Sequence, residues 1–498
     1  MATVRDITTM CKSGQLQEAS DLAKADMETD PTNVWTQREV GWALYYRIKE
    51  DTEKAVFESI LLHLKELQSL SELKVPDDNM IFENVLFKIA EYIRNHISIN
   101  DISSSSKLSS LFSILRDFEF DSSRGYSFLL QCFIKFDNWP EMADFFDWWK
   151  LDKLTQEDFL PFKLENRRVI MSLAERAFIA KSKALLRLND HGRIEEFLPQ
   201  MDDLMEKHPE MTYPGYFYGK LLLALGSTPE EALKVTIPFA RKKASEFWVW
   251  QLLSDIFAYE PEKQLACLIR AVNCGAKENY LGKVRIKLAE LYIQRQQLEY
   301  AKFQIDKVTK LYLSEGYNLP YKIDCWIHQP WINSVTSNGN SPIDYMNITN
   351  DILCKGAEEA IAVIVNFNPQ TCKSILIYGY EKSISHKLRF KAAVGSILKI
   401  KYIKEADNKV RILSAEPSRI PTNLDYAKVV EGKVSKRDDK DFAFLKSDNG
   451  DFFINPQMVK KYRLQNDEYV KGLAVYNFNS KKESWAWTCL SINKQSKK

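Results

Sequence analysis

The spacing of apolar residues divides the chain into a helical part and a β-rich part. Over residues 1–315, apolar side chains recur at i, i+3 and i+4, the spacing of an amphipathic helix. After Gly356 the period becomes two, and short segments rich in Ile, Val and Tyr alternate with turn residues. The pattern predicts a multidomain protein in which an N-terminal all-α solenoid is followed by one or two small all-β barrels.

Both ends of the helical part carry residues at the spacing of a tetratricopeptide repeat. One set is Gly14, Leu16, Ala19, Ala23 and Pro31, and the other is Leu288, Ala289, Tyr292, Leu298, Ala301, Ile305 and Val308. Small residues in such repeats let two helices approach, while larger ones fill the groove to the next hairpin. The middle of the region loses this register. We therefore expect a tetratricopeptide-like α-solenoid over 1–315 with irregular middle repeats.

Two aromatic runs, at 145–149 and 247–250, fit either a peptide-binding groove or the core between helices. Their helical spacing favours the core. Residues 316–355 are rich in Pro, Gly and polar side chains, which predicts a linker or connector. Trp326 and Trp331 within it predict that part of this segment docks against the solenoid.

The β-rich part contains two sets of strand candidates. The first predicts an OB-like β-barrel over 356–420, and the second predicts another small barrel over 426–493. In the second set, Asp448-Asn449-Gly450 separates two aromatic segments and indicates a hairpin. Alternation places Ala443, Leu445, Phe452 and Ile454 on one face and Phe442, Phe444 and Phe453 on the other. The second face is either exposed or packed under a neighbouring domain.

Charge is distributed unevenly along the chain. The net charge is +2, but residues 356–498 hold 26 lysines and arginines against 16 aspartates and glutamates. The remaining residues are acidic overall. This asymmetry favours a polyanionic partner for the C-terminal part, although solvated faces and tails also produce such differences.

Residues 429–492 resemble the cold-shock type of OB-fold. Lys440-Asp441-Phe442-Ala443-Phe444-Leu445 is similar to the ribonucleoprotein-1 motif, and Asp451-Phe452-Phe453-Ile454-Asn455 to ribonucleoprotein-2. The continuation from Asn455 to Leu464 is similar to the RNA-binding domain of the terminator Rho. The resemblance implies binding of single-stranded RNA or DNA by stacking on aromatic side chains. Asp441 and Ala443 stand where the motif usually has glycines, and Asn455 where it usually has histidine.

The resemblance and the surrounding charges together define a candidate nucleic-acid site. Its stackers are Phe442, Phe444 and Phe453, and its phosphate ligands include Lys433, Lys440 and Lys446. The complete set of predicted binding residues is Lys433, Lys436, Arg437, Lys440, Phe442, Phe444, Lys446, Phe453, Asn455 and Lys460.

Catalysis, metals and cofactors find no support in the sequence. The 6 histidines are scattered, and no HExxH, P-loop, GxSxG or GxGxxG motif occurs. The 8 cysteines form no CxxC pair, which suits a reducing cytoplasm. The N-terminus lacks the apolar core of a signal peptide, and no apolar run is long enough for a membrane span. We expect a cytoplasmic, non-enzymatic protein without cofactor.

Three functions remain open on this basis. The first is an adaptor that holds single-stranded nucleic acid, RNA in preference to DNA, on its C-terminal barrel and a protein partner on its solenoid. The second is a scaffold that binds proteins only, with the phenylalanines buried between the barrels. The third is an accessory subunit of a nucleic-acid-processing or defence complex whose catalytic subunit is another chain.

Overall fold

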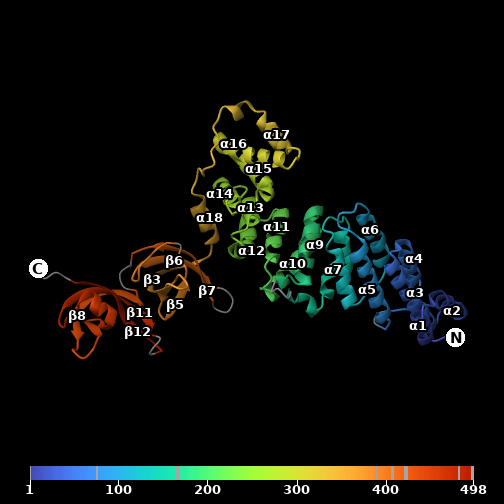
Figure 1. Ribbon diagram of the computed structural model, residues 1–498, viewed down its shortest axis with the longest axis horizontal. Helices are drawn as coiled ribbons and strands as arrows, with labels where there is room; N and C mark the ends of the chain where they lie inside the picture. The colour runs from blue at the N-terminus through green and yellow to red at the C-terminus, as the bar shows by residue number, and fades with distance from the viewer. Residues whose placement is uncertain are drawn as a thin grey trace. The chain divides into compact units, whose positions relative to one another are not determined.

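The structure is a computed structural model that describes residues 2–74, 77–163, 169–388, 390–404, 409–419, 424–479 and 483–494. The chain forms two compact units, residues 1–264 with 271–287, and residues 265–270 with 288–498. Helices dominate up to Ser314, and two β-sheets follow Gly356 (Figure 1). The predicted fold class, an all-α region followed by small all-β bodies, is confirmed.

The first unit is built from helices joined by short loops. Its helices are α1 (Val4–Lys12), α2 (Leu16–Thr29), α3 (Val34–Lys54), α4 (Phe57–Gln68), α5 (Asn79–His96), α6 (Ser103–Leu115), α7 (Arg124–Phe133), α8 (Met142–Trp149), α9 (Leu173–Leu188), α10 (His191–Lys207), α11 (Pro214–Ala224), α12 (Pro229–Lys242) and α13 (Phe247–Ile256). The next helices are α14 (Pro261–Val272), α15 (Glu278–Gln294) and α16 (Leu298–Ser314). None of the described helices is both long and apolar enough to span a bilayer.

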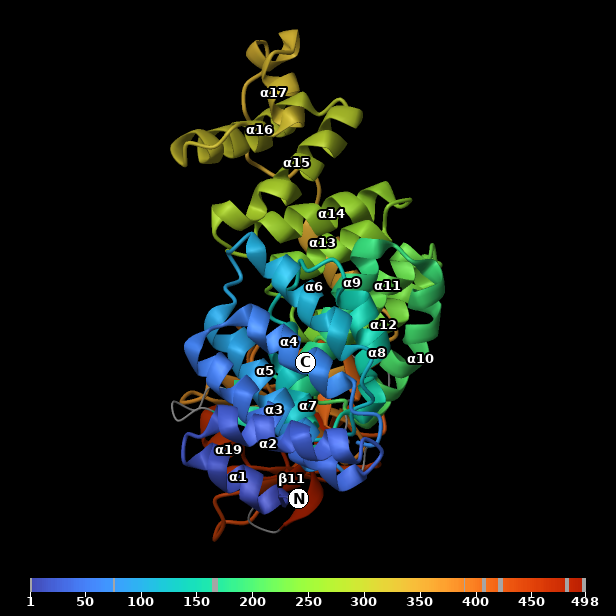
Figure 2. The same ribbon diagram turned by 90° about the vertical axis from the view of Figure 1, so that its right-hand side faces the viewer.

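Successive helices of the first unit pack as a row of hairpins. Helix α3 contacts α5, α5 contacts α7, α7 contacts α9, and α9 contacts α11. Figure 2 views this row from its N-terminal end, with α1 and α2 near the viewer. The small residues Ala19 and Ala23 are fully buried, which allows α2 and α3 to approach closely. This packing is that of an α-solenoid, and the tetratricopeptide assignment itself stays a prediction.

The aromatic runs of the solenoid form core, as their spacing predicted. Phe145, Phe146 and Trp149 are fully buried. Trp149 stacks on Tyr126 with ring centroids 4.6 Å apart and an interplanar angle of 8°. In the second run, Trp250 is also fully buried. Rings of this size each bury a large apolar area, so they stabilise the contacts between hairpins.

A two-stranded hairpin of β1 (Phe162–Lys163) and β2 (Val169–Ile170) interrupts the helical row. It follows two short 3-10 helices, η1 (Leu151–Lys153) and η2 (Gln156–Phe159). Helical spacing did not predict this hairpin, because two-residue strands are too short to show alternation.

Residues 316–355 contain α17 (Tyr321–Ile327), η3 (Pro330–Asn333) and α18 (Tyr345–Leu353). Part of this segment packs on α16. The Lys302 ammonium donates to the carbonyl oxygens of Ile332 at 2.7 Å and Val335 at 3.0 Å, and the Asn338 N–H donates to the carbonyl of Glu299 at 3.0 Å. These contacts confirm the predicted docking of the connector against the helical part.

The first β-body is a five-stranded antiparallel sheet with strand order β5-β4-β3-β6-β7. Its strands are β3 (Glu358–Asn368), β4 (Lys373–Gly379), β5 (Lys382–His386), β6 (Ile397–Lys404) and β7 (Val410–Pro417). Its core includes Ile364, Leu376 and Ile400, all fully buried. The order is that of an OB barrel left open, since its third strand, β5, and its fifth strand, β7, do not pair with each other among the described residues.

The second β-body is a closed barrel with the pairing order β8-β9-β10-β12-β11 and back to β8. Its strands are β8 (Ala427–Lys436), β9 (Ala443–Ser447), β10 (Gly450–Ile454), β11 (Tyr469–Asn479) and β12 (Ser484–Lys494). Helix α19 (Pro456–Tyr462) lies between the third and fourth strands in sequence, and β10 pairs with β12 in parallel. This is the five-stranded Greek-key arrangement of an OB-fold.

An apolar cluster joins the two β-bodies. Val363 and Ile377 of the first pack with Ala427, Leu473 and Val475 of the second. The Tyr426 hydroxyl donates to the carbonyl of Ile361 at 2.6 Å, and burial raises the pKa of Tyr426 to about 12. The cluster therefore covers the outer surface of the middle of β11.

We predict that thiol reagents will label Cys372 much faster than Cys489. Cys372 is exposed, whereas Cys489 is fully buried in the second barrel, and burial raises the pKa of the Cys489 thiol to about 12. Since the thiolate is the reactive form, Cys489 should resist iodoacetamide at pH 8 until the barrel unfolds. Mass spectrometry after timed labelling measures this; labelling of Cys489 as fast as Cys372 would contradict the barrel core described here.

Candidate nucleic-acid interface

The β9–β10 hairpin presents different side chains on its two faces. Ala443, Leu445, Phe452 and Ile454 point inward and are at most 1 % exposed. The register pairs Phe453 with Phe444 across the two strands, and both lie on the opposite face. The predicted division of the hairpin into a core face and an outer face is therefore confirmed.

Phe442, Phe444 and Phe453 form a cluster of three rings on the outer face, called the ring cluster below. Each pair of ring centroids lies between 5.7 and 5.9 Å apart, and the planes are tilted or edge-to-face. All three side chains are half-buried. They shield one another at their edges, as aromatic pairs prefer, and leave apolar ring surface facing solvent.

The ring cluster takes no part in joining the two β-bodies. Among the described residues, the apolar cluster between the bodies draws on β3, β4, β8, β11, β12 and the segment before β8, not on β9 or β10. The idea that these phenylalanines are buried between barrels is not what the structure shows. The ring cluster therefore lies on the outer surface of the second barrel, away from its junction with the first β-body.

A row of polar and charged residues runs beside the ring cluster. Lys433 on β8 pairs directly with Lys446 on β9, and Tyr469 on β11 pairs with Lys433. All three side chains are exposed. Lys446 also makes an ion pair with Asp451. Two like charges directly opposite each other destabilise a sheet, and an anion bound between them would relieve that repulsion.

A polar pocket of about 930 Å³ adjoins the ring cluster. It lies between the loop from β8 to β9 and helix α19, and Asp441 at its edge directly precedes Phe442. Its basic lining residues are Lys436, Lys440, Lys460 and Arg463, and its acidic ones are Asp438 and Asp441. The pocket is therefore suited to polar groups, with a small excess of positive charge.

The loop from β8 to β9 is held against the turn that follows α19. The backbone N–H of Lys436 donates to Asn466 Oδ1 at 3.0 Å, and the N–H of Lys440 donates to the carbonyl of Arg437 at 3.2 Å. In OB-folds, the surface of strands two and three and the loop between strands one and two contact oligonucleotides. In this barrel those elements are β9, β10 and this loop.

The predicted residues do not all have the same role. Lys436, Lys440 and Lys460 line the polar pocket, whereas Arg437 is exposed on the loop outside the pocket lining. Asn455 is the N-cap of α19, because its Oδ1 accepts from the Met458 N–H at 2.9 Å. This capping bond gives Asn455 a structural role.

Two residues of the surface were not predicted from the sequence. Tyr469 on β11 lies beside Lys433 on the neighbouring strand. Arg463 lines the polar pocket and has a left-handed φ of 47° at the end of α19. Tyr469 could have been found by following alternation along β11 from Lys471. Arg463 could not, because its position depends on where the helix ends.

Comparisons with known families agree with the barrel. Residues 428–492 match the model of S1/CSD-like domain 2 of the TOTE conflict systems, and residues 212–350 match a Domain of unknown function (DUF7017). Neither match covers half of the chain. No curated protein and no solved structure matches the chain. The predicted cold-shock-like domain is thus supported as an S1/CSD-like domain, a class that suggests nucleic-acid binding.

Proposed function

We propose that this protein is a non-catalytic adaptor that binds single-stranded nucleic acid, RNA in preference to DNA, on its second barrel. The observation that carries the proposal is the ring cluster, which lies open on strands two and three of an OB-fold beside the lysine pair Lys433 and Lys446. Open rings stack on bases without regard to sequence, and lysines attract the backbone phosphates.

The helical part would hold a protein partner, as solenoids do with their extended surfaces. No group of three or more metal-ligating side chains occurs among the described residues, and the proposal requires no cofactor.

A second candidate function is an accessory subunit of a conflict-system complex whose catalytic chain is separate. The match of residues 428–492 to a domain of the TOTE conflict systems favours it. Affinity purification of the full chain from its own cells, with and without nuclease, tests it. Co-purification of a helicase or nuclease chain supports the accessory role, and recovery of the protein with nucleic acid alone contradicts it.

The salt dependence of binding gives a quantitative test of whether Lys433 and Lys446 contact phosphate groups. Each phosphate contact on a single strand contributes about 0.7 to the slope of log K against log salt concentration. Lys433→Ala should lower the magnitude of that slope by about 0.7. Asp451→Asn should strengthen binding severalfold, since it releases Lys446 from its ion pair. Anisotropy titrations of a labelled single strand at several salt concentrations measure both, and an unchanged slope in Lys433→Ala would remove that lysine from the interface.

A further inference from the structure

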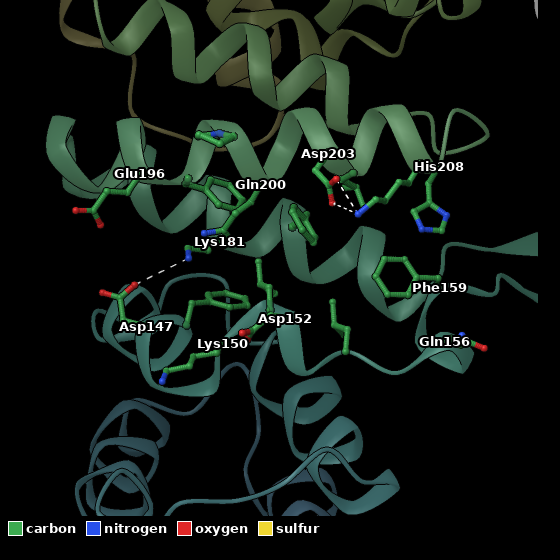
Figure 3. A pocket seen from close by; sticks show the side chains of 18 of the residues that line it. Asp147, Lys150, Asp152, Gln156, Phe159, Lys181, Glu196, Gln200, Asp203 and His208 are labelled. Carbon is green, nitrogen blue, oxygen red and sulfur yellow. Dashed lines mark hydrogen bonds and ion pairs between the residues drawn. The ribbon is translucent and has the colours of Figure 1, made fainter.

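The first unit contains a pocket of about 1230 Å³ that lies far along the chain from the nucleic-acid interface. It is lined by α8, η1, η2, α9 and α10, all within residues 146–210. Figure 3 shows Lys181 and Asp147 joined by a dashed line on one side of it, with Asp203, Phe159 and His208 on the other. Its volume is somewhat larger than the roughly 300–1,000 Å³ of typical small-molecule sites, so a small organic ligand would fill only part of it.

Aromatic rings form part of the pocket wall. Charged side chains form another part of it: Asp147, Lys150, Asp152, Lys181, Arg193, Glu196, Asp203, Lys207 and Glu210. Phe178 and Phe197 stack with centroids 5.6 Å apart, and Phe159 stacks on His208 at 4.5 Å with an interplanar angle of 15°. All four residues line the pocket. Such walls bind the apolar body of a ligand and leave its orientation to a small number of polar groups.

Lys181 is a buried cation in this wall, and its recorded partners are an ion pair with Asp147 and the ring of Phe197. The residue is only 8 % exposed, and its Nζ lies 4.9 Å from the centre of the Phe197 ring. Two carboxylates act on it. The Asp147 Oδ1 lies 4.0 Å from its Nζ, an ion pair longer than a hydrogen bond, and Glu196 also lines the pocket. Asp147 is also shared, because its Oδ2 lies 3.6 Å from Arg193 Nε.

An ammonium group has three donors, and burying it without hydrogen-bonding partners is costly. Burial accordingly lowers the pKa of Lys181, and Asp147 and Glu196 act in the opposite direction. A buried ammonium that lines a pocket with aromatic walls, and whose nearest carboxylate lies beyond hydrogen-bond distance, can donate to a ligand that brings its own negative charge.

We propose that this pocket binds a small organic anion, a molecule with an aromatic or bulky apolar body and one negatively charged group that accepts hydrogen bonds from Lys181. The body would lie against Phe178 and Phe197. Carboxylate and phosphate groups share the required chemistry. The site is independent of the proposed nucleic-acid surface, so either assignment can fail without the other.

Two fluorescent probes that differ in one charge test the proposal on the full chain. The probes are 8-anilinonaphthalene-1-sulfonate, which is anionic, and N-phenyl-1-naphthylamine, which lacks the sulfonate. Lys181→Met keeps most of the side-chain volume, so it should weaken the anionic probe about tenfold or more and leave the neutral probe within about twofold. Asp147→Asn should strengthen the anionic probe. Lys88→Met, which removes a lysine paired with Glu91 on α5, is the matched control and should change neither.

If Lys181→Met does not fold, displacement of the anionic probe from the unmodified protein by small competitors tests the proposal instead. Benzoate and phenyl phosphate should displace the anionic probe at concentrations at which benzyl alcohol does not, and the stronger of the two identifies the preferred head group. Equal displacement by benzyl alcohol, or an anionic-probe affinity that survives Lys181→Met, would overturn the proposal. In that case Lys181 serves only to join α9 to α8 through Asp147.

Discussion

Replacing Phe442, Phe444 and Phe453 together with leucine is expected to weaken binding of a single-stranded oligonucleotide about 100-fold. Each base stacked on an aromatic side chain contributes roughly 1–3 kcal/mol, and the ring cluster offers surface for more than one base. Leucine retains apolar bulk on the outer face but lacks a planar ring. Fluorescence anisotropy with the full-length protein and a labelled RNA of mixed sequence measures the affinity.

The matched control for this experiment is Phe367→Leu. Phe367 is 48 % exposed on the first sheet, away from the second barrel's outer face, so its replacement should leave affinity within about twofold. Thermal unfolding of each variant shows whether the barrel remains intact. A triple variant that stays folded and binds as tightly as the unmodified protein would contradict stacking as the basis of binding.

Replacing Gly432 with alanine is expected to destabilise the second barrel by about 3 kcal/mol or more. A Cβ at this position would lie 1.9 Å from the carbonyl oxygen of Lys446 and 2.8 Å from its carbonyl carbon. These are backbone atoms of the paired strand β9, so they cannot move aside without breaking the pairing of β8 with β9. Labelling of the buried Cys489 thiol at increasing denaturant concentration, followed by mass spectrometry, measures the loss in this barrel.

Lys433→Ala is a control in the same strand that should lower the affinity for nucleic acid without lowering the stability of the barrel. Lys433 is the next residue after Gly432 and its side chain is exposed, so this variant should keep the stability of the barrel while it loses affinity for nucleic acid. Gly432→Ala should lose both as the barrel unfolds. If Gly432→Ala were as stable as the unmodified protein, the close approach of β8 and β9 at this point would be wrong.

The strands and their faces could be predicted because alternation is a local property. The β9–β10 hairpin shows this alternation clearly, because Ala443, Leu445, Phe452 and Ile454 alternate with outward residues. Asp448-Asn449-Gly450 marks the turn between the two strands. Helical periodicity similarly indicated buried aromatic rings such as Trp149 and Trp250.

Helix α19 was missed, although its start carries two recognisable signals. Asn455 is an N-cap residue and Pro456 occupies the first helical turn, where its missing N–H costs nothing. The resemblance to a nucleic-acid-binding motif led us to assign Asn455 to binding, and its capping bond to Met458 supplies a different reason for an asparagine there.

Pairings between distant residues lie beyond what a single sequence reveals. The direct opposition of Lys433 and Lys446 depends on the register of two strands. The pocket of the first unit contains residues from α8 to α10, and Lys181 looks in the sequence like any lysine on a helix. Only the three-dimensional packing shows that it is buried with its nearest recorded carboxylate 4.0 Å away.

The central claim is that single-stranded nucleic acid lies across the ring cluster of the second barrel. Ultraviolet cross-linking of a uridine-rich RNA to the full-length protein, followed by mass spectrometry of the cross-linked peptides, tests it most directly. The account predicts cross-links at Phe442, Phe444 or Phe453 and in neighbouring peptides within residues 433–469, reduced by excess unlabelled single strand and hardly by duplex. Cross-links confined to the helical part or to the first sheet, or none at all, would contradict it.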